Sequence, residues 1–174
     1  IYEDNHIIVV IKPYNVAVQE DDSKDLDMLT IIKDYIKERD NKPGNVFLGL
    51  VHRLDRPTGG VMVFAKTSKA ASRLSKQIKD KTMRKKYFCV VNGKPQLASN
   101  RLVTYLKKDE KTNTVKIAPK LELGAKEAIL DYEVVVSKDK YSLIDVNLIT
   151  GRSHQIRVQM SAQLNATIFG DFKY

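Results

Sequence analysis

A succession of short strand-like runs separated by turns fills most of the second half of the chain and constrains the fold more than any other feature. The runs are alternating or wholly apolar, with Asn-Gly and Lys-Asp turns between them. Such runs favour antiparallel hairpins. The predicted strands are residues 87–91, 101–106, 114–117, 128–136 and 141–148.

The rest of the chain adds two apolar strands and three helices. Residues 7–11 and 60–65 are apolar runs that predict buried strands. Residues 26–39 have helical spacing, with Asp25 as the expected N-cap. A second helix is predicted to run to about Asp80, with Thr67 or Ser68 as its N-cap. The expected buried stripe of this helix is Ala70, Ala71, Leu74 and Ile78. A third helix is predicted over residues 153–164, with Ile156, Met160 and Leu164 as its buried stripe.

Strands outnumber helices and do not alternate regularly with them. The sequence therefore predicts an α+β fold with a mixed, mostly antiparallel central sheet flanked by helices. No internal repeat, low-complexity tract or linker divides the 174 residues, so a single domain over residues 1–174 is expected.

Composition excludes several classes of protein. With 43% apolar and 29% charged residues the chain is globular rather than disordered. The one cysteine, Cys89, lies in an apolar run, so we expect an inert thiol and a cytoplasmic setting. No apolar run approaches the roughly 20 residues of a membrane span. The histidines and Cys89 are scattered without ligand spacing, so no metal site is expected.

The formal net charge of +9 is concentrated in one segment. Residues 1–45 hold ten acids and six Lys or Arg, whereas residues 66–86 hold nine Lys or Arg and one acid. A segment of this kind can bind nucleic-acid phosphates, although a solvated helix face has the same composition. Lys69, Arg73 and Lys76 are expected on the exposed side of the second helix.

Residues 51–66, VHRLDRPTGGVMVFAK, place one carboxylate, Asp55, between a His-Arg pair and a Gly-containing turn. The turn leads into residues 60–65, which predict a strand buried on both faces. An acid on a loop held by a buried strand is well placed for chemistry. The alternative is a surface ion pair between Arg53 and Asp55.

Two further segments accompany this loop. Residues 84–86 are basic and precede Tyr87 at the start of a predicted strand, and residues 150–157 read TGRSHQIR. The three blocks, in this order, resemble the signature of the RluA-type pseudouridine synthases. Lys12-Pro13 and Gly170-Asp171 extend the resemblance over essentially the whole chain.

The resemblance implies an RNA-modifying isomerase that needs no cofactor. Asp55 corresponds to the family's catalytic carboxylate, which either attacks the anomeric carbon of the target uridine or removes a ribose proton. Arg157 corresponds to the Arg that pairs with this Asp, and Tyr87 to the Tyr that stacks on the target base. Ile156 is a candidate opposite wall. Without the resemblance, Arg157 reads as a helix-surface residue, Tyr87 as the edge of a core, and Ile156 as helix core.

A uridine in folded RNA must leave its stack to be modified, at a cost of a few kcal/mol. The resemblance assigns Arg53 to the flipped nucleotide or its neighbours. Arg152 and His154 are expected at a helix N-terminus, which suits phosphate. The implied partner is ribosomal or transfer RNA, with no membrane and no obligatory protein partner. The remaining candidate RNA contacts are Lys69, Arg73, Lys76 and Lys86.

The chain departs from the family pattern in three places. Gly59 stands where Ser is usual, and Asn15 where a Gly commonly follows Lys-Pro. The sequence stops inside the Gly-Asp-x-x-Tyr-Gly block and lacks an initiator Met, so we expect a catalytic domain incomplete at its C-terminus and possibly at its N-terminus.

Two other functions share parts of this pattern. A non-catalytic RNA-binding module would use the basic segment equally well, but it would not require Asp55, Tyr87 and Arg157 together. A protein kinase is rejected because Leu54 interrupts the His-Arg-Asp pattern and no Gly-rich loop precedes it.

Overall fold

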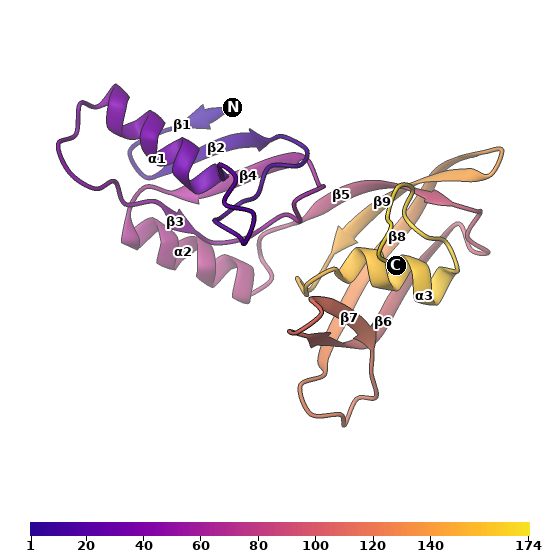
Figure 1. The fold of residues 1–174 in the computed structure, drawn as a ribbon. Helices are drawn as coiled ribbons and strands as arrows, with labels where there is room; N and C mark the ends of the chain where they lie inside the picture. Colours follow the sequence, from indigo (N-terminus) through magenta and orange to yellow (C-terminus); the bar gives the residue numbers. More distant parts are fainter. The chain divides into compact units, whose positions relative to one another are not determined.

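The computed structural model describes all 174 residues, and the chain divides into two compact units, Ile1–Thr82 and Met83–Tyr174 (Figure 1). Each unit has its own sheet and its own hydrophobic core. A single domain over residues 1–174 stays a prediction.

The first unit is a four-stranded antiparallel sheet with two helices, and its strand order is β1-β2-β4-β3. The two central strands, β2 and β4, are the two apolar runs that the sequence predicted as strands. The elements are β1 (Tyr2–Glu3), β2 (Ile7–Lys12), α1 (Met28–Arg39), β3 (Gly49–Leu50), β4 (Gly60–Ala65) and α2 (Ser68–Lys79).

Helix α1 packs on one face of this sheet, where its apolar stripe meets alternate residues of β2 and β4. The buried core contains Ile32 and Ile36 of α1, and Met62 and Phe64 of β4. Helix α2 lies on the other face. Leu48 and Leu50 contribute to the core with α1, whereas a Cβ atom at Gly49, between them, would lie 3.0 Å from the Cβ of Ala71 in α2. The four apolar residues of its predicted stripe are all half-buried rather than fully buried.

Three predictions for this unit were wrong. Residues 7–11 were expected to form a buried strand, but Ile11 at the end of this run is 66% exposed. Strand β4 is not buried on both faces, because Val61 is 61% exposed while its neighbour Met62 is fully buried. The N-cap of α1 is Asp27, whose carboxylate accepts hydrogen bonds from the N–H groups of Leu29 and Thr30. Asp25 is paired with Arg56 instead.

The second unit is a five-stranded antiparallel sheet of order β5-β9-β8-β6-β7, joined by one helix. All five strands were predicted, two of them with the bounds that the structure has. The elements are β5 (Lys86–Asn92), β6 (Ser99–Asp109), β7 (Thr114–Ile117), β8 (Lys126–Lys138), β9 (Tyr141–Leu148) and α3 (Gln155–Leu164). The α+β class is confirmed, with the strands divided between two wholly antiparallel sheets.

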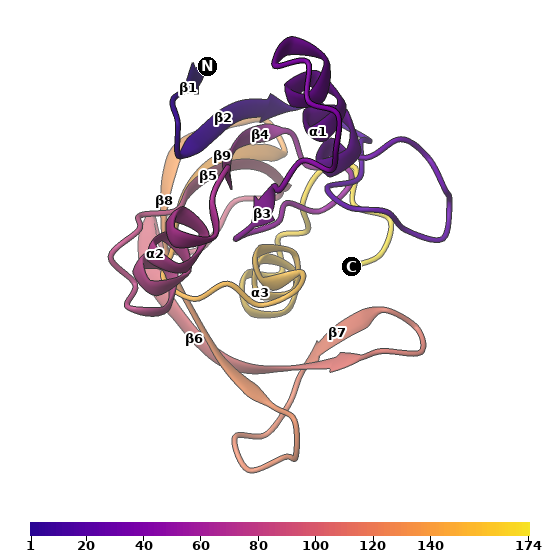
Figure 2. The same cartoon turned by 90° about the vertical axis from the view of Figure 1, so that its left-hand side faces the viewer.

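Helix α3 covers one face of the second sheet (Figures 1 and 2), and Met160 is fully buried in the core between them. Ile156 and Leu164, predicted to be buried with it, are half-buried and pack against the same core. The helix begins at Gln155 rather than Ser153. His154 adopts a left-handed conformation with φ 50°, so the helix cannot extend toward the N-terminus through it.

Candidate active site

Asp55 lies half-buried on an irregular loop between β3 and β4. A turn closes behind it, because the N–H of Thr58 donates to the carbonyl of Asp55 at 2.9 Å. The loop is fixed to β4 by His52, whose Nε2 accepts a hydrogen bond from the N–H of Val63 at 3.1 Å. Leu54 packs against the core of the first unit. The loop is therefore held by the side chains of His52 and Leu54 before Asp55 and by a backbone hydrogen bond from Thr58 after it.

Lys12, at the end of β2, is fully buried beneath this loop. Its ammonium donates to the carbonyl oxygens of Pro13 at 2.8 Å and Arg56 at 3.0 Å. Burial lowers the pKa of Lys12, the charge of Arg56 lowers it further, and the negative charge of Asp55 opposes both. A buried cation thus acts on Asp55 from within the same unit. In the sequence, Lys12 stands out only as part of the Lys-Pro motif, and no role for it was predicted.

Arg56, the residue after Asp55, ties the loop to the acidic segment that precedes α1. Its Nε donates to the carbonyl of Asn15 at 3.2 Å, and its Nη1 donates to the hydroxyl of Ser23 at 2.8 Å. It also forms ion pairs with Asp21 and Asp25. Arg56 is therefore a positioning cation for two loops, a role that only long-range contacts reveal.

The predicted RNA contacts of the first unit are on its surface. Arg53, two residues before Asp55, is exposed. Lys69, Arg73 and Lys76 are all exposed on α2, as expected, although Lys76 also forms an ion pair with Asp80. Thr67 caps the helix by accepting a hydrogen bond from the N–H of Ala70. The face is basic and accessible, and its contact with RNA stays a prediction.

Tyr87 and Lys86 begin β5 in the second unit. Tyr87 is half-buried and packs against the core under α3, as expected for a residue at the edge of that core. Its stacking on the target base stays a prediction. Lys86 is exposed and lies 3.2 Å from Asp145. Farther along the strand, burial raises the pKa of the Cys89 thiol to about 12, as expected for inert packing.

The block at residues 150–157 is anchored by two buried polar side chains that sequence reasoning missed. The hydroxyl of Thr150 donates to Gln155 Oε1 at 2.8 Å and also accepts from the N–H of Ile129. Gln155 Nε2 donates to the carbonyl of Ile129 and to Gln159 Oε1. These bonds fix the start of α3 to β8. Arg152 lies just before α3, and its Nε donates a hydrogen bond to the carbonyl of Glu127 in β8 at 2.7 Å.

Arg157 meets a carboxylate in two-point geometry, and this carboxylate belongs to Asp171. The Nε–Oδ2 and Nη2–Oδ1 distances are both 2.7 Å, and only 5% of the Asp171 side chain is exposed. Burial raises the pKa of Asp171, but the hydrogen bonds from Arg157 and the N–H of Lys173 lower it below its ordinary value. The guanidinium also lies 5.0 Å from the ring centroid of Tyr174, whose hydroxyl is 2.6 Å from His154 Nδ1.

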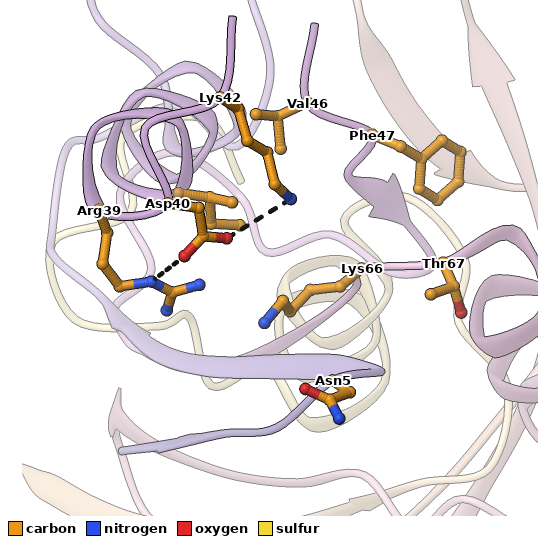
Figure 3. Close-up of a pocket in the computed structure, with 9 residues that line it drawn as sticks. Asn5, Arg39, Asp40, Lys42, Val46, Phe47, Lys66 and Thr67 are labelled. Carbon is orange, nitrogen blue, oxygen red and sulfur yellow. Dashed lines mark hydrogen bonds and ion pairs between the residues drawn. The ribbon is translucent and has the colours of Figure 1, made fainter. Parts of the chain in front are cut away.

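The first unit also has a hollow of about 350 Å³ beside the end of α1 (Figure 3). Its cations are engaged by acids: Arg39 and Lys42 with Asp40, and Lys66 with Glu3. None of the predicted catalytic residues lines it. We therefore place the candidate site at the Asp55 loop and not in this hollow.

The structure brings the predicted residues together in two groups. Asp55 and Arg53 share the loop of the first unit, whereas Tyr87, Ile156 and Arg157 belong to the second. The pairing of Arg157 with Asp55 stays a prediction. No group of three or more His, Cys, Asp or Glu side chains is arranged to hold a metal ion, and no helix is long and apolar enough to cross a membrane.

Comparison with known proteins identifies the family. The family model described as RNA pseudouridylate synthase matches residues 6–162. The chain is 35% identical over its whole length to the ribosomal large subunit pseudouridine synthase C of Buchnera aphidicola, and 32% identical to the synthase D of Borreliella burgdorferi. It covers 53% of each of these relatives.

A solved structure titled Human RNA Pseudouridylate Synthase Domain Containing 4 is 25% identical, with a TM-score of 0.84, over 99% of this chain and 67% of that one. The chain spans about half the length of the curated relatives it matches. The match to the family model covers most of the chain, and the predicted resemblance to RluA-type enzymes is confirmed. The chain belongs to the RNA pseudouridylate synthase family.

Proposed function

We propose that this protein isomerises specific uridines in structured RNA to pseudouridine, with Asp55 as the catalytic carboxylate. One observation carries the proposal: Asp55 is half-buried on a loop that is held from both sides and lies within the influence of a buried cation, Lys12. A fixed, ionised carboxylate is what the reaction requires. The loop also belongs to the segment that matches the family model.

The reaction breaks the bond between the uracil nitrogen and the ribose, turns the base and rejoins it through carbon, with no net change in composition. An ionised Asp55 can attack the anomeric carbon or remove a neighbouring ribose proton. Substrate that covers the loop excludes water, so a negative charge on Asp55 then needs cations close to it. Lys12 supplies one in the first unit, and we propose that Arg157 adds a second during the reaction.

We assign Tyr87 to stacking on the target base and Ile156 to the opposite wall of the base pocket. Arg53, Lys86, Arg152 and His154, with the exposed cations of α2, are the proposed RNA contacts. Several relatives are named for the ribosomal large subunit, so ribosomal RNA is the first substrate to test and transfer RNA the second. Both substrates imply action in the cytoplasm.

The test uses Asp55→Asn, a nearly isosteric change that removes only the ionisable group. Unmodified transcripts of bacterial large-subunit ribosomal RNA and of transfer RNA are incubated with protein, and pseudouridine is measured by mass spectrometry of the nucleosides. We expect Asp55→Asn to abolish product while leaving RNA affinity within about tenfold of the parent. Asp34→Asn, on the exposed side of α1, is the matched control and should keep parental activity.

The second candidate function is a non-catalytic RNA-binding module, favoured by the exposed cations of α2. It predicts RNA binding without pseudouridine formation by the parent chain. Turnover by Asp55→Asn above a few per cent of the parental rate would remove Asp55 from its proposed role.

A further inference from the structure

Tyr14, in the segment that follows β2, presents an exposed aromatic ring that packs against the loop carrying Asp55. The residue is 77% exposed, yet its ring packs directly on Gly59, four residues after Asp55. A Cβ atom at Gly59 would lie 3.1 Å from the ring. The family pattern usually has Ser at this position. Because Gly59 has no side chain, the ring of Tyr14 can pack against it.

The backbone on both sides of Tyr14 is fixed. The carbonyl of Pro13 accepts a hydrogen bond from the buried Lys12 at 2.8 Å, and the carbonyl of Asn15 accepts one from Arg56 at 3.2 Å. Asn15 has φ 60°, a left-handed conformation that turns the chain immediately after the ring. A ring held in this way loses little conformational freedom when a ligand covers it.

The charges around the ring argue for a neutral ligand surface rather than a phosphate. Arg56 is engaged by Asp21 and Asp25, so its charge is already balanced. Lys12 is buried, and Asp55 adds a further negative charge. An exposed π face in such surroundings suits the flat face of a base, whereas phosphates are attracted to the basic surface of α2.

We propose that Tyr14 stacks on an RNA base adjacent to the target uridine and holds the strand while the uridine is turned out. This inference rests on the proposed function, because it takes the nucleotide at Asp55 to be the target. The neighbours of that nucleotide are covalently attached to it and must lie close to the loop. Aromatic side chains recognise such unstacked bases with little sequence preference.

The first experiment measures binding with two probes, a 12-nucleotide oligouridylate and an abasic ribose-phosphate strand of the same length. Tyr14→Ala should weaken oligouridylate binding at least about fivefold and leave abasic binding unchanged, because only the base contact is lost. Tyr14→Phe keeps the ring and should bind like the parent. Tyr2→Ala removes another exposed tyrosine of the same unit, on the edge strand β1, and should change neither affinity.

The second experiment moves the ring without removing it. Gly59→Ser adds a Cβ 3.1 Å from the ring, so the ring must shift by a few tenths of an ångström, and we expect a smaller loss of oligouridylate binding than in Tyr14→Ala. In the Tyr14→Ala background the same Ser should have no further effect, since there is no ring to displace. This non-additivity distinguishes a displaced ring from general damage to the loop.

Parental affinity in Tyr14→Ala, or an equal loss on both probes, would overturn the stacking proposal. The two hypotheses fail separately. Pseudouridine formation by the parent, together with unchanged binding in Tyr14→Ala, overturns the stacking role and leaves the proposed function. A base-dependent loss in Tyr14→Ala, with no pseudouridine from the parent on any transcript, supports stacking and overturns the proposed function.

Discussion

Replacing Arg157 by Met tests whether this guanidinium contributes to the stability of the fold, to the catalysed reaction, or to both. Its two-point contact with Asp171 joins side chains that are 19% and 5% exposed. Breaking a buried pair by removing one partner costs about 3–5 kcal/mol, because the remaining charge is left without compensation. Since Arg157 is partly exposed, we expect the lower end, about 3 kcal/mol, in urea unfolding followed by circular dichroism at pH 7.

The same variant should show a characteristic pH dependence. The pKa of Asp171 is lowered in the folded protein, so the pair contributes stability above the unfolded pKa of about 3.9 and loses it as the pH falls through the folded value. In Arg157→Met the carboxylate is buried without its cation, and protonation relieves the cost. The stability difference between parent and variant should therefore shrink below about pH 4. A difference that stays constant down to pH 3 would refute the reasoning.

Turnover separates the two roles of Arg157. If it also acts on Asp55, Arg157→Lys should lower turnover at least about tenfold, roughly 1.4 kcal/mol in the barrier, because Lys keeps the charge but loses the planar fork. Asp171→Asn removes the partner but leaves the guanidinium, and should lower turnover less. Equal losses in the two variants would mean that Arg157 affects the chemistry only through Asp171.

Two other predictions concern the surface of α2 and the thiol of β5. Neutralising Lys69, Arg73 and Lys76 together should weaken RNA binding and reduce the slope of log affinity against log salt by about 2, with little effect on turnover at saturating RNA. Neutralising Lys24, Lys33 and Lys37 removes the same charge elsewhere in the first unit, and an equal change in slope would show that the α2 face has no special role. Cys89, with its pKa raised to about 12, should react with iodoacetamide at pH 8 at least about 100-fold more slowly in the native than in the urea-unfolded protein. Comparable rates would show that the thiol is accessible.

Local patterns predicted the elements of the fold well. β7 and β9 have the predicted bounds, because each is a run with a turn residue in a left-handed conformation beside it, Asn113 or Asp139. The N-cap of α2 was also one of the two predicted residues. These features depend on neighbours within a few positions, which the sequence displays directly.

Long-range competition explains what local patterns missed. Asp25 has the chemistry of an N-cap, but Arg56, 31 residues away, takes its carboxylate, and Asp27 caps α1 instead. The exposure of Val61 depends on which part of the sheet the helices cover, and a uniformly apolar run carries no sign of that. A sequence pattern identifies candidate residues by their type, whereas tertiary contacts determine which candidate takes the role.

The cations at the candidate site follow the same logic. Resemblance directed attention to Arg157 as the partner of Asp55, and its pattern gives no hint of Asp171, fourteen residues later, as a bidentate partner. The resemblance included Lys12 but gave it no role, although Lys12 is fully buried, binds the carbonyl of Arg56 and acts electrostatically on Asp55. A lysine at the end of an apolar strand looks like an exposed strand terminus until the loop that covers it is in place. The loop and Lys12 satisfy each other: the carbonyl groups compensate the buried ammonium, and the ammonium fixes the backbone next to the carboxylate.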